Sequence, residues 1–190
     1  MAGTRVIVGL GNPGSEYVST RHNVGWWFLD RLAEEWQFGR FRSQGNAAVA
    51  SGRVEGFAVR LLKPLTFMNR SGAALAPLRR LEGFDLARDL LVVVDDVALE
   101  PGRARFRPGG SAGGHNGLKS LQATLGAQQY PRLRIGVGAA PPQWDLADWV
   151  LSRPPPQERQ AVLKLFPDLI ECVRIWMNEG IEAAMNRCNR

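Results

Sequence analysis

Apolar residues occur along this chain in two distinct patterns. Short runs that are mostly apolar, several of them rich in β-branched residues, predict strands at residues 5–10, 47–51, 57–62, 90–94 and 133–137. Apolar positions at helical spacing predict helices at about residues 23–38, 71–81 and 115–125, a helix that follows Pro154–Pro156, and a last helix from about residue 168. Strands interleaved with helices are typical of an α/β fold, in which helices cover a sheet.

The strongest strand signal is the wholly apolar run Leu90–Val94, which predicts a central strand. This run ends in two acidic residues, Asp95 and Asp96. The two apolar runs before it flank a turn at Arg53–Gly56 and predict a pair of strands. Ser71 has the side chain of a good N-cap, and we expect it to begin the helix at residues 71–81.

The chain has 190 residues, of which 45% are hydrophobic and 22% are charged. That balance is typical of a globular protein and excludes a disordered or collagen-like chain. The length favours one domain, which we assign to residues 1–190. No apolar run approaches the roughly 18 residues of a membrane helix, and no signal peptide is evident. Cys172 and Cys188 lack metal-ligand spacing and require no oxidising compartment, so we expect a cytoplasmic protein.

The net charge of +6 points to a polyanionic partner without specifying it. Arg103, Arg105 and Arg107 alternate with smaller or apolar residues, a spacing that predicts three guanidinium groups on one face of a strand. Guanidinium groups bind phosphate through paired hydrogen bonds. The competing interpretation is dispersed surface charge, which does not predict such clustering.

Residues Gly9–Gly14 match the dinucleotide-binding pattern G-x-G-x-x-G after a predicted strand. That motif requires a helix to begin at the glycines, so that the helix N-terminus holds a pyrophosphate. Here Pro13 and Gly14 predict a turn, and helical periodicity starts about ten residues later. The acidic residues at the expected ribose-binding distance, Asp30 and Glu34, lie on a predicted helix. We therefore reject dinucleotide binding.

Residues Gly109–Gly113 match the nucleophile pattern G-x-S-x-G around Ser111. A hydrolase of that type needs an acidic residue and then a histidine further along the chain. His115 follows Ser111 by four residues, and the next acidic residue, Asp145, comes after it. The order is wrong, so a serine triad is not expected, and tight turning remains the simpler explanation for these glycines.

Polar side chains follow several predicted strands, in the loops where ligands bind to open α/β sheets. They are Asn12, Tyr17 and His22 after the first strand, Asn69 after a later one, and Asp95 with Asp96 after the apolar run. A histidine oriented by a carboxylate acts as a general base, and amides hold a carbonyl or its oxyanion. Without an evident covalent nucleophile or metal cluster, water is the expected nucleophile. Each residue alone also fits a capping or turn role.

Longer stretches carry a specific resemblance to a known family. Five of them resemble motifs of bacterial-type peptidyl-tRNA hydrolase, with Tyr17 between the first two: Val8–Gly14, Thr20–Asn23, Lys63–Gly72, Asp95–Asp96 and Gly109–Lys119. They occur in the order found in the family, and the resemblance covers the chain from about Val6 to Asn186. It implies a single-domain α/β fold with a twisted mixed sheet flanked by helices, usually monomeric, without metal or cofactor.

The resemblance also implies an activity and its residues. The family hydrolyses the ester between a peptide and the 3′-terminal ribose of tRNA, and so recycles peptidyl-tRNA that leaves the ribosome early. By motif position, His22 looks like the base that activates water, Asp95 like its orienting carboxylate, and Asn12 like a residue that distinguishes N-blocked esters. Further positions match residues that bind the peptidyl-tRNA end (Tyr17, Phe67, Asn69 and Asn116) or a tRNA 5′-phosphate (Arg107 and Arg134).

A second function class stays open at this stage. Some relatives of this fold bind RNA without catalysis, and such a protein would keep the basic face while the catalytic residues drifted. The presence of His22, Asp95, Asn12, Asn69 and Asn116 together favours the hydrolase. Departures from the family pattern are small: Arg107 stands where lysine is usual, and Pro108 stiffens the start of the glycine-rich loop.

Overall fold

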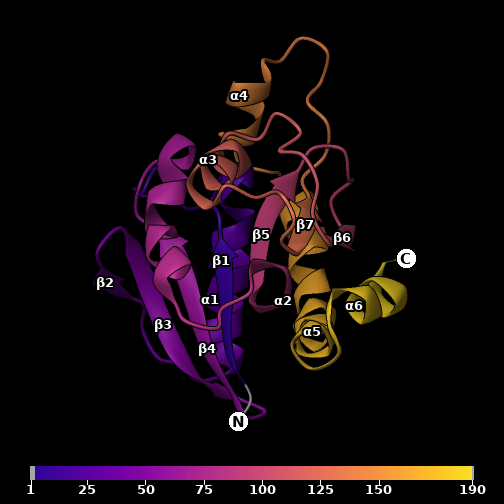
Figure 1. Cartoon of the computed structure of the whole chain (residues 1–190). Coiled ribbons are helices and arrows are strands. Elements are labelled where there is room, and N and C mark those ends of the chain that lie inside the picture. The colour runs from indigo at the N-terminus through magenta and orange to yellow at the C-terminus, as the bar shows by residue number, and fades with distance from the viewer. Residues whose placement is uncertain (1–2, 190) are drawn as a thin grey trace.

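A mixed seven-stranded sheet forms the centre of the molecule, with helices on both of its faces (Figure 1). The computed structural model describes residues 3–189, so residues 1, 2 and 190 of the expected domain lie outside it. The strands are β1 (Thr4–Gly9), β2 (Arg42–Gln44), β3 (Ala47–Val54), β4 (Phe57–Pro64), β5 (Leu90–Asp96), β6 (Ala104–Arg107) and β7 (Arg132–Gly136). The α-helices are α1 (Val24–Glu35), α2 (Leu86–Asp89), α3 (Asn116–Leu125), α4 (Leu146–Val150), α5 (Pro156–Glu179) and α6 (Ile181–Cys188). Three 3-10 helices complete the described chain: η1 (Arg21–Asn23), η2 (Met68–Ala74) and η3 (Ala76–Arg80).

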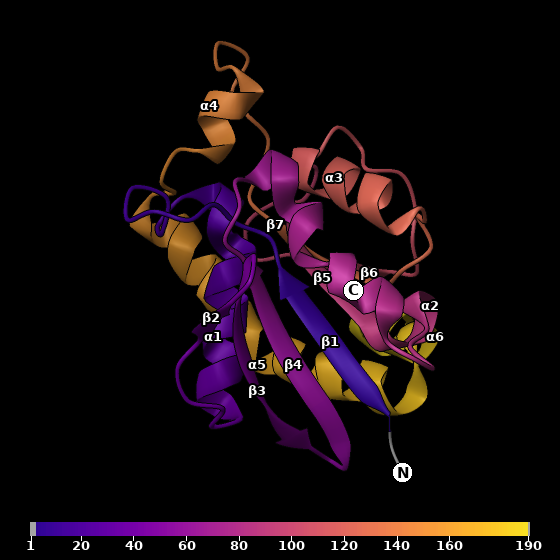
Figure 2. The same cartoon turned by 60° about the vertical axis from the view of Figure 1, so that its left-hand side comes forward.

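The strand order β2-β3-β4-β1-β5-β7-β6 places four parallel strands in the middle of the sheet. The remaining strands pair antiparallel, β2 and β3 at one edge and β6 at the other. Carboxyl ends of parallel strands meet at one edge, so the loops after β1, β4 and β5 come together there. Helix α4 projects beyond that same end of the sheet (Figures 1 and 2). The predicted α/β architecture and the central position of β5 are confirmed.

Each face of the sheet buries its own hydrophobic core. One core joins α1, α5 and α6 to the sheet through residues such as Phe28, Val173 and Trp176. The other joins α3, η2 and η3 to the opposite face through residues such as Leu75 and Leu121. Alternate residues of β5 enter different cores, which is why its sequence is apolar without a break. Among residues 3–189, no helix is both long and apolar enough to cross a bilayer.

Two helix predictions were wrong. Residues 71–81 form no α-helix but parts of η2 and η3, and the Ser71 hydroxyl donates to the carbonyl of Met68 at 2.8 Å instead of capping. Pro77 stands at the start of η3, and its missing N–H prevents a continuous helical ladder. The helix expected after Pro154–Pro156 is confirmed, but the separate helix expected from residue 168 is its continuation, because α5 begins at Pro156 and continues through Pro167. Buried apolar residues on both sides of Pro167 pack into one core, and their burial offsets the roughly 3 kcal/mol cost of an interior proline. The short elements β2, α2 and α4 were not predicted.

The C-terminal residues close the β6 edge of the sheet. A disulfide joins Cys172 of α5 to Cys188 of α6, residues 16 apart in the sequence. The neighbouring Asn189 accepts a hydrogen bond from the amide of Phe106 at 2.7 Å and donates one to its carbonyl at 2.9 Å. Asn189 thus pairs with the edge strand as another strand would. A loop of this length gives a disulfide roughly 3 kcal/mol of stabilisation.

Candidate active site

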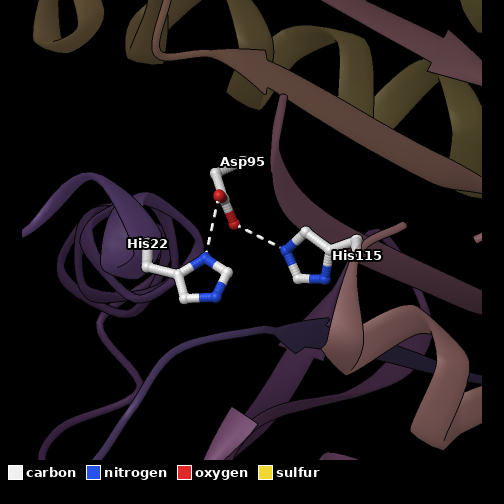
Figure 3. A group of neighbouring side chains, drawn as sticks. All are labelled: His22, Asp95 and His115. Carbon is white, nitrogen blue, oxygen red and sulfur yellow. Dashed lines mark hydrogen bonds and ion pairs between the residues drawn. The ribbon is translucent and has the colours of Figure 1, made fainter. Parts of the chain in front are cut away.

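Three side chains from separate segments meet at the carboxyl end of the sheet (Figure 3). His22 comes from η1, Asp95 from the end of β5, and His115 from the turn before α3. The Nδ1 atom of His22 lies 2.8 Å from Oδ2 of Asp95, and Nε2 of His115 lies 2.8 Å from Oδ1 of Asp95. The Asp95 side chain is buried, and each of its oxygens accepts from one imidazole. The pairing of His22 with Asp95 was predicted from the sequence, whereas the part of His115 was not.

Hydrogen bonds from the backbone determine which ring nitrogen of His115 carries the proton. Its Nδ1 atom caps α3 by accepting the amides of Gly117 at 3.1 Å and Leu118 at 3.4 Å. A ring nitrogen that accepts carries no proton, so Nε2 carries it and donates to Asp95. The sequence signal for this role was weak: a histidine directly before a predicted helix.

His22 has the opposite arrangement. Its Nδ1–H group donates to Asp95, which leaves Nε2 as the free lone pair of a neutral ring. Burial disfavours the charged imidazolium, but the charge of Asp95 and the hydrogen bond to it outweigh burial, so the pKa of His22 is raised. For Asp95, burial acts to raise the pKa, but the two histidines and their hydrogen bonds prevail and lower it. Asp95 is therefore held as a carboxylate, and the imidazole of His22 is more basic than a free one.

A pocket of about 220 Å³ opens next to this cluster. Its polar lining residues include His22, His115, Asn116 and Arg134. Part of its apolar lining comes from α4, through Leu146, Ala147 and Val150. A small group bound here would contact a base, amides and an apolar surface at once.

Asn12 lies at the same edge and is held rigidly. Its backbone N–H donates to Oδ1 of Asn23 at 2.9 Å, and its carbonyl accepts from Nδ2 of Asn23 at 3.0 Å. Its own Oδ1 accepts the amide of Met68 at 2.7 Å. This bond fixes the orientation of the Asn12 amide, so Nδ2 is the group that remains to donate to a ligand. Asn23, which is fully buried, was not predicted as a site residue.

Three of the other predicted site residues lie outside the pocket wall. Tyr17 and Phe67 meet edge to face, with ring centroids 6.4 Å apart, and Phe67 is 58% exposed. Asn69 is exposed on η2. The η2 segment is nevertheless close to the start of α3, because a Cβ added to Gly117 would lie 2.6 Å from the sulfur of Met68. Phe67 and Asn69 therefore flank Met68, which packs against Gly117, the residue that follows Asn116.

The predicted arginine cluster forms on one face of β6 and β7. Arg105 pairs with Arg134 and Arg107 with Arg132 across the antiparallel register, so all four share a face. Arg132 is fully buried and donates to the carbonyls of Gly110 and Ser111, whereas the other three are at least partly exposed. Arg103 precedes β6, so its predicted place in the strand was wrong. Arg134 also lies 3.5 Å from Asp96, within reach of a weak ion pair.

Two glycines, one at the end of β1 and one just after it, have packing roles. A Cβ on Gly9 would lie 2.5 Å from the carbonyl oxygen of Gly25, and one on Gly11 would lie 2.6 Å from the ring of Trp26. Both contacts are with α1, which begins only at Val24. No helix starts at these glycines, in agreement with the rejection of a dinucleotide site.

The convergence of two histidines and a carboxylate also has the composition of a metal site. Their candidate donor atoms lie within 4.8 Å of one another. The Nε2 lone pair of His115 would be needed, but the cap at Nδ1 keeps a proton on Nε2. The donor set therefore suits a hydrogen-bonded carboxylate better than a metal ion.

Comparisons with known proteins find relatives along the whole length of this chain. A sequence model of the family described as peptidyl-tRNA hydrolase matches residues 6–190. A peptidyl-tRNA hydrolase from Gemmatimonas aurantiaca is 47% identical over 98% of this chain and 100% of its own length. One from Symbiobacterium thermophilum is 46% identical, over 97% of this chain and 98% of its own length. The crystal structure of peptidyl-tRNA hydrolase from Acinetobacter baumannii superimposes with a TM-score of 0.91 at 34% identity, covering 100% of this chain and 96% of that one.

Proposed function

The chain belongs to the peptidyl-tRNA hydrolase family, and on that premise we propose how its residues hydrolyse peptidyl-tRNA. The reaction cleaves the ester between a peptide and the 3′-terminal ribose of tRNA, which recycles peptidyl-tRNA that has left the ribosome. The observation that carries the assignment is the 2.8 Å bond between His22 Nδ1 and Asp95, with Nε2 left free beside the pocket.

In the first step His22 acts as the general base. A water molecule attacks the ester carbonyl carbon while its proton passes to Nε2 of His22. The resulting imidazolium keeps its Nδ1–H bond to Asp95, whose carboxylate stabilises the positive charge. Since both rings share this carboxylate, His115 holds it in place during the transfer.

In the second step the tetrahedral intermediate collapses. The bond between the carbonyl carbon and the ribose 3′-oxygen breaks, and the imidazolium of His22 returns its proton to that oxygen. The products are a tRNA with a free 3′-hydroxyl and a peptide carboxylic acid, which releases its proton to solvent and becomes a carboxylate. An ester is an easier substrate than an amide, so one base with polar stabilisation of the oxyanion can suffice.

The asparagines are assigned to recognition. Nδ2 of Asn12 is positioned to donate to a peptide carbonyl, which fits the distinction between N-blocked and free aminoacyl esters. Asn116 lines the pocket, and Asn69 lies on η2, so both can hold peptide backbone or the attacking water. The exposed pair Tyr17 and Phe67 offers aromatic faces to the nucleotide end of the substrate.

We assign the arginine-bearing face of β6 and β7, called the arginine face below, to the binding of tRNA phosphate. Arg107 and Arg134 share it with Arg105, and Arg134 reaches the pocket that holds His22. The presence of Arg134 in the lining of that pocket supports a phosphate contact near the ester site. No cofactor, metal or obligate protein partner enters the scheme, and we propose that the enzyme acts as a monomer.

We also propose a cytoplasmic location, where peptidyl-tRNA arises. In a reducing compartment Cys172 and Cys188 would be mainly thiols, so the disulfide would serve the protein only under oxidation.

The deciding test is release of N-acetyl-amino acid from N-acetyl-aminoacyl-tRNA by wild-type protein and by His22→Ala. Removal of a general base costs roughly 10²–10⁴-fold in rate. A folded His22→Ala protein within threefold of wild type would end the proposed mechanism. The alternative of a non-catalytic RNA binder predicts tRNA affinity without turnover in the wild type.

A further inference from the structure

Arg21, the residue directly before His22, is buried and makes an unusual set of contacts. Its side chain is 4% exposed, and its Cζ atom lies 3.5 Å from the ring centre of Trp149. Its Nη1 donates to Oγ of Ser152 at 2.6 Å, and its Nη2 donates to Oε2 of Glu158 at 3.0 Å. All three partners belong to α4, the turn after it, or the first turn of α5.

The backbone reinforces the same connection. The amide of Arg21 donates to the carbonyl of Ser152 at 3.0 Å. Trp149 in turn donates from Nε1 to the carbonyl of Gly138 at 2.9 Å, which ties the other end of the segment to the sheet. Residues 138–152 connect β7 to α5. Trp149 links both ends of this segment to the rest of the molecule, because it stacks on Arg21 and donates to Gly138.

Helix α4 needs such an anchor. It has only five residues, too few to be stable alone, and only Val150 of them is buried. Leu146 is 51% exposed, and Trp144 just before the helix is 44% exposed. Yet α4 supplies part of the apolar lining of the pocket that His22 also lines. The position of α4 therefore depends on contacts outside the helix, and these include the stack of Arg21 on Trp149 and the bond from Trp149 to Gly138.

We propose that Arg21 is a positioning residue that holds α4 in place as one apolar wall of the substrate pocket. This inference rests on the proposed function of that pocket. Arg21 acts on substrate binding and not on proton transfer, because the partners of its guanidinium are Ser152, Glu158 and Trp149, whereas His22 is bonded to Asp95. Loss of the stack should therefore raise KM and leave kcat nearly unchanged.

The test uses the full chain with N-acetyl-aminoacyl-tRNA. Arg21→Leu removes every guanidinium contact, Arg21→Lys keeps the charge, and Trp149→Leu removes the stacking partner without burying an unpaired charge. Removal of a desolvated cation–π interaction corresponds to roughly a tenfold rise in KM. We expect that rise in Arg21→Leu and Trp149→Leu, with kcat within threefold and the pH dependence of kcat unmoved, and a smaller rise in Arg21→Lys.

The matched control is a second arginine–tryptophan stack elsewhere in the molecule. Arg159 lies over the ring of Trp27 at 4.6 Å, and neither residue lines the pocket. Arg159→Leu should leave KM unchanged. Hydrogen exchange gives an independent readout: amides of residues 146–152 should exchange faster in Arg21→Leu, while those of β5 should not.

The outcomes separate the two proposals. If wild-type protein shows no turnover, the proposed function fails before Arg21 is tested. If wild type is active and Trp149→Leu has unchanged KM and unchanged exchange in α4, the positioning role is wrong. If Arg21→Leu folds and loses kcat with a shifted pH profile, Arg21 orients His22 and not α4, which also overturns the inference.

Discussion

His115 donates to Asp95 through a ring nitrogen whose proton is fixed by the backbone. The Nδ1 atom of His115 accepts the amides at the start of α3, so its Nε2–H must point at Oδ1 of Asp95, 2.8 Å away. His22 places a second N–H on the other oxygen. Residue 95 therefore receives two donors and has to offer two acceptors.

Asp95→Asn should consequently be almost as damaging as loss of His22. An asparagine offers one acceptor, and His115 cannot reverse its own proton without losing the α3 cap. The amide NH₂ then faces His22, whose proton moves to Nε2 and blocks the base. We expect a fall in kcat of roughly 10²–10⁴-fold, measured with N-acetyl-aminoacyl-tRNA.

A double variant tests this explanation. In Asp95→Asn with His115→Ser, the serine retains a helix cap but no longer donates to residue 95 as the imidazole does. The asparagine oxygen is then free for His22, and part of the missing rate should return. A double variant no faster than Asp95→Asn alone would show that the charge of Asp95, and not the count of acceptors, is decisive.

The convergence of the site could be predicted from the sequence because parallel strands bring their following loops to one edge. Asn12 and His22 lie in the segment after β1, and Asp95 lies at the end of β5. These two strands are neighbours in the sheet. The role of His115 could not be predicted, since it depends on which ring nitrogen faces the helix. Arg132 and Arg134 look equivalent in the sequence, but the first is buried under the glycine-rich loop. The difference in their burial comes from tertiary packing, which the spacing of residues along the sequence does not reveal.

The α4 wall was missed for a related reason. Residues 146–150 are too few to show a helical pattern, and the position of their helix depends on the stack of Arg21 on Trp149. The failure at residues 71–81 has a different cause. A capping serine and apolar spacing favoured a helix there, but Pro77 interrupts the ladder and two 3-10 turns result.

The pH dependence of kcat/KM should report His22. The active form has a neutral imidazole, so kcat/KM should rise with pH through the pKa of His22, which lies above its ordinary value of 6.5. In the Asp95→Asn, His115→Ser variant the carboxylate charge is gone, so the pKa of His22 should fall and the acidic limb should move to lower pH. An acidic limb that stays in place in a folded variant would assign it to another group.

Removal of divalent metal ions should leave hydrolysis unchanged. A metal bound between His22 and His115 would need the protonated Nε2 of His115 and would break the bond between His22 and Asp95. Dialysis against EDTA, followed by assay of a short mimic of the tRNA 3′ end, avoids the effect of magnesium on tRNA folding. Loss of activity that one particular divalent ion restores would overturn this prediction.

Substitutions in the arginine face should weaken tRNA binding without slowing the hydrolysis of the ester. Arg107 and Arg134 lie on the shared face of β6 and β7, and their contacts with phosphate would be electrostatic. Arg107→Ala with Arg134→Ala should raise KM for full-length peptidyl-tRNA and barely change hydrolysis of a minimal aminoacyl-nucleotide ester. The salt dependence of tRNA binding should weaken by up to about 1 in log–log slope for each phosphate that the variant no longer binds.

The control for this pair carries the same change of charge at the opposite edge of the sheet. Arg40 and Arg42 are both exposed, and Arg42 belongs to the edge strand β2, at the other end of the strand order from β6. Arg40→Ala with Arg42→Ala should leave both KM and the salt slope close to wild type if the effect is local. Equal losses in the two double variants would mean that net charge alone attracts tRNA. Equal loss of activity on both substrates in the Arg107 and Arg134 variant would mean that these guanidinium groups serve the ester site or the fold, because a distal phosphate contact cannot affect a substrate that lacks the phosphate.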